Sequence, residues 1–208
     1  MTTPTDTGPW ARLAIAAGIG LAVGALTQLG QGLLPGDASQ AANAISPWLL
    51  VAFLVASTLP RPPWAIVAAI VSLVGSLVGY YALVQLRFGY AGSTSAYLVW
   101  GAGALAGGVV FGLAGWAWRH ARRDVARVIA IGLVAGVFVA EAIYEAVVLG
   151  KVGVGIGFAI VGLALPAILG RSRGDRLGGY LAIVPALAMG ALGYVVFITL
   201  YGAISGVG

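Results

Sequence analysis

The sequence predicts an all-α membrane protein, a compact bundle of seven transmembrane helices with the N-terminus inside and the C-terminus outside. The first observation is composition: 61% of the residues are hydrophobic and only 8% are charged, against about a quarter charged in soluble domains. The second is a series of apolar runs that approach the roughly 20 residues needed to cross a bilayer. The third is an uneven distribution of basic residues between alternate loops, which is typical of multi-pass membrane proteins.

The predicted spans together form a single transmembrane helical domain, residues 1–208. They lie near residues 13–34, 39–59, 64–86, 96–118, 128–149, 152–169 and 177–203. The first run imitates a secretory signal, but its apolar stretch exceeds the roughly 7–15 residues of such a signal and Asp6 precedes it, so we expect it to be retained. The second span is the weakest, because its apolar core is short and must be extended backwards across Pro47.

Basic residues gather on one side of the predicted membrane. With the N-terminus inside, the outer side holds only Arg87 and Lys151. The inner side holds Arg12, Arg61, Arg119, Arg122, Arg123, Arg127, Arg171, Arg173 and Arg176. If residues 39–59 lay only in the interface, the arginine-rich loops would face outward, against the usual bias. The net charge of +5 therefore indicates topology anchors beside the lipid bilayer and no nucleic-acid partner.

Glycines recur at four-residue spacing within the predicted spans, a pattern that lets helix backbones approach closely in lipid. The pairs are Gly20 and Gly24, Gly75 and Gly79, Gly103 and Gly107, Gly108 and Gly112, Gly132 and Gly136, and Gly153 and Gly157. We expect these pairs to serve mainly internal packing. Pro166 and Pro185 fall within the last two spans and should kink them.

Two carboxylates fall inside the fifth predicted span. Measured at 1.5 Å per residue from the midpoint of that span, Glu141 lies about 4 Å and Glu145 about 10 Å towards the outer side. An ionisable group at that depth is costly unless a partner, water or a ligand compensates it, so the pair marks a candidate functional site. Like charges four residues apart on a helix also repel, which favours a bound proton or cation.

Other polar and aromatic side chains gather in the outer halves of the predicted helices. The candidate ligand-binding residues are Glu141, Glu145, Tyr144, Gln28, Gln31, Asn43, Trp48, Tyr80, Tyr81 and Trp100. One interpretation is a polar cavity open to the outer face that binds a cationic solute against aromatic rings, or that exchanges a proton or metal ion. The other is hydrogen bonding between helices without a ligand. For Trp100, an interfacial aromatic belt is a further explanation.

Motifs of enzyme chemistry are absent from the sequence. There is no Ser–His–Asp set, no zinc-protease motif and no phosphate-binding loop, and the single histidine, His120, lies in an arginine-rich loop. The chain has no cysteine, which excludes disulfides and cysteine-based metal sites. We therefore expect no enzyme activity, no cofactor and no metal site.

Short motifs are spread over most of the chain. They are Gln31-Gly32-Leu33-Leu34-Pro35, Ala42-Asn43 followed by Ser46-Pro47-Trp48, Gly79-Tyr80-Tyr81, and Ala140-Glu141-Ala142-Ile143-Tyr144. Together they resemble the pattern of an uncharacterised family of small bacterial multi-pass membrane proteins, a domain of unknown function. The resemblance implies that the motif positions are Gln31, Asn43, Pro47, Trp48, Tyr81, Glu141 and Tyr144. Glu145 is not clearly part of that motif.

The loop 35–46, which carries Asp37, Gln40 and Asn43, is similar in position to a loop in the substrate-binding subunits of energy-coupling-factor vitamin transporters. In those subunits the loop between the first two helices covers a ligand in the outer half of the bundle. This second, weaker resemblance implies a membrane partner subunit docked on small residues of the first helix. Those subunits usually have six spans, so seven predicted spans are a departure.

These observations predict a multi-pass protein of the bacterial inner (plasma) membrane. It would bind a small polar or cationic solute in a cavity open to the outer face, as an uptake component. The alternative is a non-transporting scaffold or interaction protein whose cytoplasmic arginine loop, residues 119–127, binds anionic lipid head groups.

Overall fold

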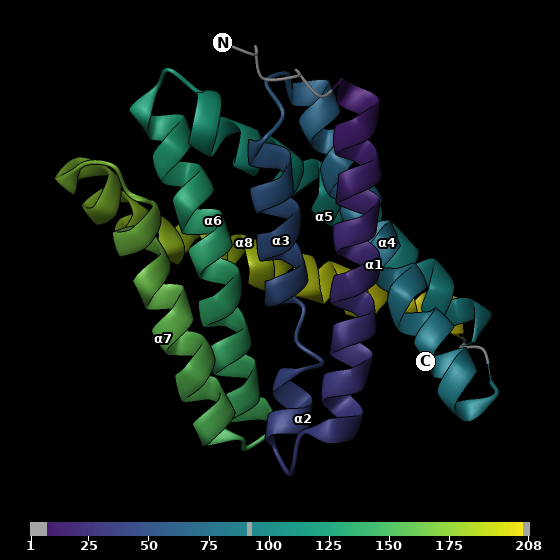
Figure 1. Ribbon diagram of the computed structural model, residues 1–208. Coiled ribbons are helices and arrows are strands. Elements are labelled where there is room, and N and C mark those ends of the chain that lie inside the picture. Colours follow the sequence, from purple (N-terminus) through teal and green to yellow (C-terminus); the bar gives the residue numbers. More distant parts are fainter. Residues whose placement is uncertain (1–7, 91–92, 206–208) are drawn as a thin grey trace.

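The computed structural model describes residues 8–90 and 93–205, with side chains throughout except at residues 40 and 193–205. Every regular element in these ranges is helical. The elements are α1 (Pro9–Leu33), α2 (Ala38–Ala41), α3 (Ser46–Ser57), α4 (Pro62–Phe88), α5 (Thr94–His120), α6 (Asp124–Ile143), the π-helical turn η1 (Tyr144–Val148), α7 (Val152–Leu169) and α8 (Arg173–Ser205). In Figure 1, α3 lies between α1 on one side and α6 with α7 on the other.

Several helix ends follow from their local sequence. α1, α3 and α4 each have proline in their first turn. Proline is favoured there because an N–H in the first turn has no acceptor within the helix, and because the proline ring holds φ near its helical value. α4 ends at Gly89, whose φ of 71° is left-handed. α5 begins after Ser93, whose hydroxyl accepts a hydrogen bond from the N–H of Ala96 at 3.2 Å.

Five helices within the described residues are long and apolar enough to cross a membrane. They are Pro9–Leu33, Pro62–Phe88, Thr94–His120, Asp124–Val148 and Val152–Leu169. Each matches a predicted span to within a few residues, and α8 covers the last predicted span. The all-α class and the multi-pass membrane character predicted from the sequence are therefore confirmed.

The second predicted span, residues 39–59, is wrong as a continuous helix. It contains most of the four-residue α2, an irregular connection and the twelve-residue α3. Pro47 explains why a helix begins here and does not continue from residue 43, because its ring excludes the i→i−4 hydrogen bond and clashes with the preceding turn. Figure 1 shows the chain leaving α2 at one end of the bundle and entering α3 nearer the centre.

α3 supplies side chains to both halves of the apolar core. Its Phe53 packs in a cluster with α6 and α7 residues such as Ile131 and Phe158. Its Ala52 and Ala56 pack in a second cluster, largely with α4. These three α3 side chains have no exposed surface, so the short helix is a central element of the fold and not a surface segment.

Close packing at the α1–α4 contact confirms the role predicted for the glycine pairs there. A Cβ added to Gly24 would collide with the backbone of Ser76, and one added to Gly79 would collide with the backbone of Leu21. Further glycines whose Cβ would meet a neighbouring helix are Gly20, Gly75, Gly107, Gly108, Gly112, Gly132 and Gly136. Glycines of the predicted pairs that face open space, where the packing prediction was wrong, are Gly103, Gly153 and Gly157.

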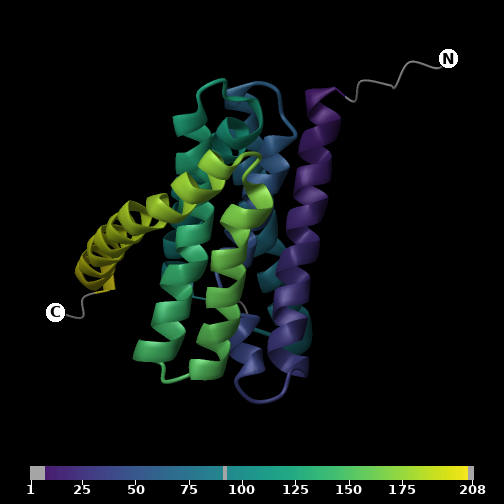
Figure 2. The ribbon, with the colours of Figure 1, turned by 90° about the vertical axis from the view of Figure 1, so that its left-hand side faces the viewer.

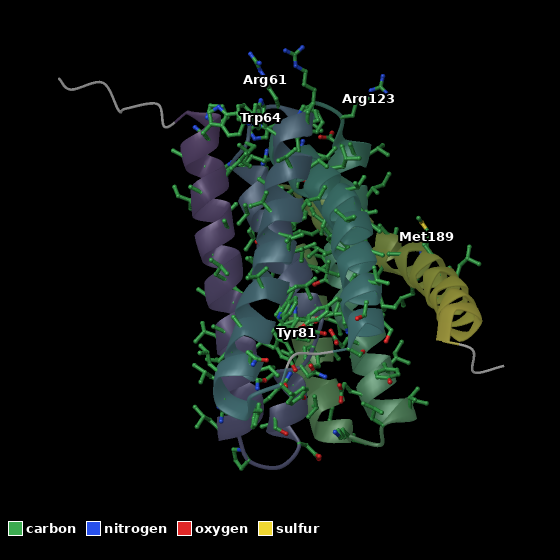
Figure 3. The ribbon with its side chains drawn as sticks, turned by 90° about the vertical axis from the view of Figure 1, so that its right-hand side faces the viewer. Arg61, Trp64, Tyr81, Arg123 and Met189 are labelled. Carbon is green, nitrogen blue, oxygen red and sulfur yellow. The ribbon has the colours of Figure 1, made fainter. Side chains whose placement is uncertain are left out.

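The basic residues of alternate loops lie at one end of the bundle, which we call the arginine end. Figure 3 shows Arg61 and Arg123 at this end, with Tyr81 in the opposite half. We call the opposite end, which carries α2 and the turn between η1 and α7, the α2 end (Figure 1).

The first part of α8 packs on α6, where Ala182 lies against Gly132 and Ala186 against Gly136. Its C-terminal part diverges from the other helices (Figure 2), and Met189 points away from them (Figure 3). The compact packing predicted for the last span therefore holds for the start of α8 and not for its whole length.

An ion pair fixes the start of α8 to α6 at the arginine end. Arg127 donates from its NH1 group to Oδ2 of Asp175 at 3.1 Å, and the Asp175 side chain is 2% exposed. The N–H of Arg171 donates to the same oxygen at 3.1 Å. Burial alone raises the pKa of the Asp175 carboxyl, but the hydrogen bonds from Arg127 and from the backbone of Arg171 outweigh it and hold that pKa below its ordinary value.

We expect the Asp175 pair to make stability fall with acid. A lowered native pKa means that the stabilisation is complete above the ordinary pKa of 3.8 and is lost as the pH falls through the native pKa. Asp175→Asn should cost about 1–3 kcal/mol at neutral pH and flatten the acid part of a thermal-unfolding profile recorded in detergent. Asp124→Asn is the matched control, because Asp124 is 81% exposed although it also bonds Arg127. An equal loss in both variants would contradict the assignment.

Candidate functional site

Glu141 of α6 binds the start of α3. Its Oε1 accepts a hydrogen bond from the N–H of Ile45 at 2.9 Å, and its Oε2 accepts one from the N–H of Ser46 at 2.8 Å. The first N–H groups of a helix have no acceptor within the helix, and the helix dipole adds partial positive charge there. The N-cap residue of α3, Ile45, supplies no side-chain acceptor. Glu141 therefore caps α3 from another helix.

The break in the second segment creates this contact. In a continuous helix over residues 39–59, the N–H groups of Ile45 and Ser46 would bond to the carbonyls four residues earlier. The break leaves them without such acceptors, and Glu141 accepts from both. Of the two interpretations open for Glu141, hydrogen bonding within the bundle is the one for which the structure provides partners.

Glu145 has no comparable partner for its second oxygen. It lies in η1, is 5% exposed, and its Oε2 makes no hydrogen bond within the described part of the chain. The charges that act on its carboxyl are those of Lys151, Glu141 and Asp37. π-helical turns inside α-helices are rare and occur frequently at functional sites. A buried carboxylate oxygen in this position is compensated by a proton, a water or a cation.

An amide and phenol network joins α1, the connection before α3, and α4. Gln31 Nε2 donates to Asn43 Oδ1 at 2.6 Å, and the Tyr80 hydroxyl donates to Gln31 Oε1 at 3.0 Å. Trp48 Nε1 donates to Thr27 Oγ1 at 2.8 Å, and its ring meets the Tyr80 ring edge-on, with centroids 6.2 Å apart. Four predicted site residues, Gln31, Asn43, Trp48 and Tyr80, thus form one connected cluster.

Aromatic contacts extend this cluster towards α5. The Tyr80 and Tyr81 ring centroids are 5.2 Å apart, and those of Tyr81 and Tyr97 are 4.6 Å apart. A groove of about 600 Å³ lies beside these rings between α4 and α5. Its lining residues are Leu77, Val78, Tyr81, Ala82, Gln85 and Tyr97. The lining is mainly apolar and includes neither glutamate, so the groove and the carboxylates are separate features of the same half of the bundle.

Three predicted residues stand apart from the cluster. Gln28 is buried, and its backbone carbonyl accepts a hydrogen bond from Arg87 at 3.4 Å. Tyr144 is 41% and Trp100 42% exposed, and neither side chain has a hydrogen bond or ring contact within the described residues. For Trp100 this exposure agrees with a place in an interfacial aromatic belt. The side chain of Gln40, in the loop likened to a ligand cover, lies outside the described part.

Sequence reasoning missed three members of this region as site residues: Thr27, Tyr97 and the peptide N–H groups that precede Pro47. Thr27 could have been found, because it lies four residues before Gln31 and therefore on the same helix face. The sequence indicated the peptide donors only indirectly, through Pro47 inside a predicted span, because a proline there can break the helix and leave N–H groups without helical acceptors. In the described residues no group of three or more His, Cys, Asp or Glu side chains is placed to hold a metal ion, which leaves the two glutamates without further side-chain ligands of that kind.

The long apolar helices place this chain among the integral, multi-pass membrane proteins. It belongs to a family of unknown function, DUF6518, whose family model matches residues 3–202. The match covers nearly the whole chain and confirms the resemblance to an uncharacterised family. Searches of curated proteins and of solved structures found no match.

Proposed function

We propose that this protein binds a small cationic or polar solute from the outer side of the bacterial inner membrane, as an uptake component and not as an enzyme. The observation that carries the proposal is the Oε2 atom of Glu145, which is buried and unpartnered among the described residues. A bound cation would supply the missing partner. Glu141 would then be the positioning residue that holds α3 in place beside the site.

The proposed topology has seven crossings, with the arginine end in the cytoplasm. Support comes from the gathering of arginines at that end, since basic loops are retained on the cytoplasmic side. In this arrangement α2, the irregular connection and α3 together form the second crossing. A non-helical connection at membrane depth is tolerated where protein buries it, and broken helices commonly mark the binding sites of transporters.

The surroundings of Glu145 favour a cationic solute. The formal charges that act on it are those of one base, Lys151, which has the largest effect, and of two further acids, Glu141 and Asp37. The α2 end carries the four-residue α2 and the turn between η1 and α7, and a solute from the outer side would enter there. The tyrosine and tryptophan rings of the neighbouring cluster offer cation–π faces to a solute on that path.

Glu145→Gln tests the proposal, because it removes the charge and keeps the shape. We expect wild-type protein in detergent to bind choline or putrescine saturably, and the variant to bind at least about tenfold more weakly, as the loss of one charge-assisted contact implies. Binding is measured by calorimetry, and uptake of the labelled compounds by proteoliposomes. Asp124→Asn is the charge-matched control at the other end of the bundle.

Two results would count against a solute site at Glu145. One is equal binding by wild type and Glu145→Gln, both folded as judged by gel filtration and thermal unfolding. The other is the absence of saturable binding of either compound by the wild type. That second outcome would favour the scaffold interpretation, in which the membrane protein binds lipids or proteins and transports nothing.

A further inference from the structure

A second groove lies at the arginine end, far from the proposed solute site. It has a volume of about 570 Å³, within the roughly 300–1,000 Å³ range of small-molecule sites. Its lining residues are Arg12, Ile15, Ile19, Val55, Ser57, Thr58, Arg119 and His120. These residues come from α1, from the last turn of α3 with the following Thr58, and from the end of α5.

The groove lies where α3 ends between α1 and α5. α1 packs mainly along α4, and α3 ends at Ser57. The two walls are then fixed over that end: Arg12 NH1 donates to the carbonyl of Thr58 at 2.6 Å, and His120 Nε2 lies 3.0 Å from the carbonyl of Ser57. The groove is therefore a built feature with hydrogen-bonded walls.

Charge and hydropathy change with depth along the groove. Arg12 and Arg119 bring positive charge at the end of the bundle. One and two turns deeper on the face of Arg12 come Ile15 and Ile19, which are 56% and 38% exposed. Val55 continues the apolar lining from α3.

This gradient matches one class of ligand. We infer that the groove binds an anionic phospholipid of the cytoplasmic leaflet, with its phosphate against Arg12 and Arg119 and an acyl chain along Ile15 and Ile19. A soluble anion would satisfy the arginines and leave the apolar wall unused. A neutral lipid would cover the wall without the charge complementarity that basic pockets between membrane helices offer to anionic head groups.

Two variants test the two halves of the site. Arg119→Ala removes a charge whose side chain has no hydrogen bond within the described residues, so the fold should tolerate it. Ile19→Trp fills the apolar part from an exposed position on α1. Native mass spectrometry of the purified protein, titrated with phosphatidylglycerol, should show binding about fivefold weaker for Arg119→Ala, as expected for the loss of one arginine near a phosphate. Ile19→Trp should also weaken binding, because the indole occupies the place of the acyl chain.

The controls are Arg61→Ala and Arg123→Ala, which remove the same charge at the same end but outside the groove (Figure 3). They should bind phosphatidylglycerol like the wild type, and phosphatidylcholine should bind the wild type more weakly. The inference is overturned if phosphatidylcholine binds as well, if either groove variant retains full affinity, or if Arg61→Ala weakens binding as much as Arg119→Ala. Displacement of the lipid by millimolar inorganic phosphate would equally overturn it, in favour of a soluble anion.

Discussion

Glu141→Ala is expected to destabilise the protein strongly, because it leaves the N–H groups of Ile45 and Ser46 without their acceptors. An unsatisfied donor costs about 1–3 kcal/mol where water is excluded, as it is at Ser46, which has no exposed surface. Ile45 is 40% exposed, so the loss of its acceptor should cost less. Core packing would also be weakened, because α3 places Phe53 in one apolar cluster and Ala52 and Ala56 in the other. Thermal unfolding in detergent, followed by gel filtration, measures the loss.

A matched pair of conservative variants makes this prediction specific. Glu141→Gln keeps one acceptor oxygen and should lose roughly one of the two hydrogen bonds, or about 1–3 kcal/mol. Glu145→Gln makes the same chemical change one turn away, where Oε2 has no partner within the described residues, and should leave stability unchanged or raise it. If the two glutamine variants unfold at the same temperature, Glu141 does not cap α3 in the way described.

The sequence predicted most of the fold because the hydropathies of the residues in a membrane span add up within the span itself. A run of about twenty apolar residues can be recognised as a membrane span without knowledge of the helices that pack on it. The observed bounds of α7, Val152–Leu169, for example, equal those of the predicted sixth span. The second span could not be predicted in this way. Its conformation depends on a carboxylate about a hundred residues further along the chain, and hydropathy contains no information on such a partner.

Several of the predicted site residues contact one another, but the sequence did not predict which pairs would be in contact. Depth along the predicted span was the only ground on which the sequence selected Glu141 as a costly group. Depth could not distinguish a ligand from a peptide N–H as the compensating partner, since either can stabilise a buried carboxylate. The same limit applies to Gln31 and Asn43: each was expected to orient a solute, and the structure shows them bonded to one another at 2.6 Å. Glu145 is the residue whose partner the described part of the protein does not supply.

Gly24→Ala is expected to be the second strongly destabilising change, through backbone collision between α1 and α4. The added Cβ would overlap the carbonyl of Ser76 and lie 2.7 Å from the backbone nitrogen of Tyr80, so one helix must move away from the other along its length. Overpacking of this kind costs about 1–3 kcal/mol, and the rigid backbone on the far side places Gly24 near the upper value. A displaced α4 would also shift Tyr80 away from Gln31, which links this contact to the polar cluster.

Gly18→Ala provides the comparison on the same helix, because nothing lies within 4 Å of a Cβ at Gly18. Alanine in place of glycine inside an open helical turn stabilises by about 0.5–1 kcal/mol through reduced backbone entropy in the unfolded chain. The two variants share the same change in helix propensity, so the difference between their unfolding temperatures isolates the contact with α4. Lower stability in Gly24→Ala with unchanged or higher stability in Gly18→Ala is the expected result. Equal behaviour of the two would mean that α1 does not approach α4 through this face.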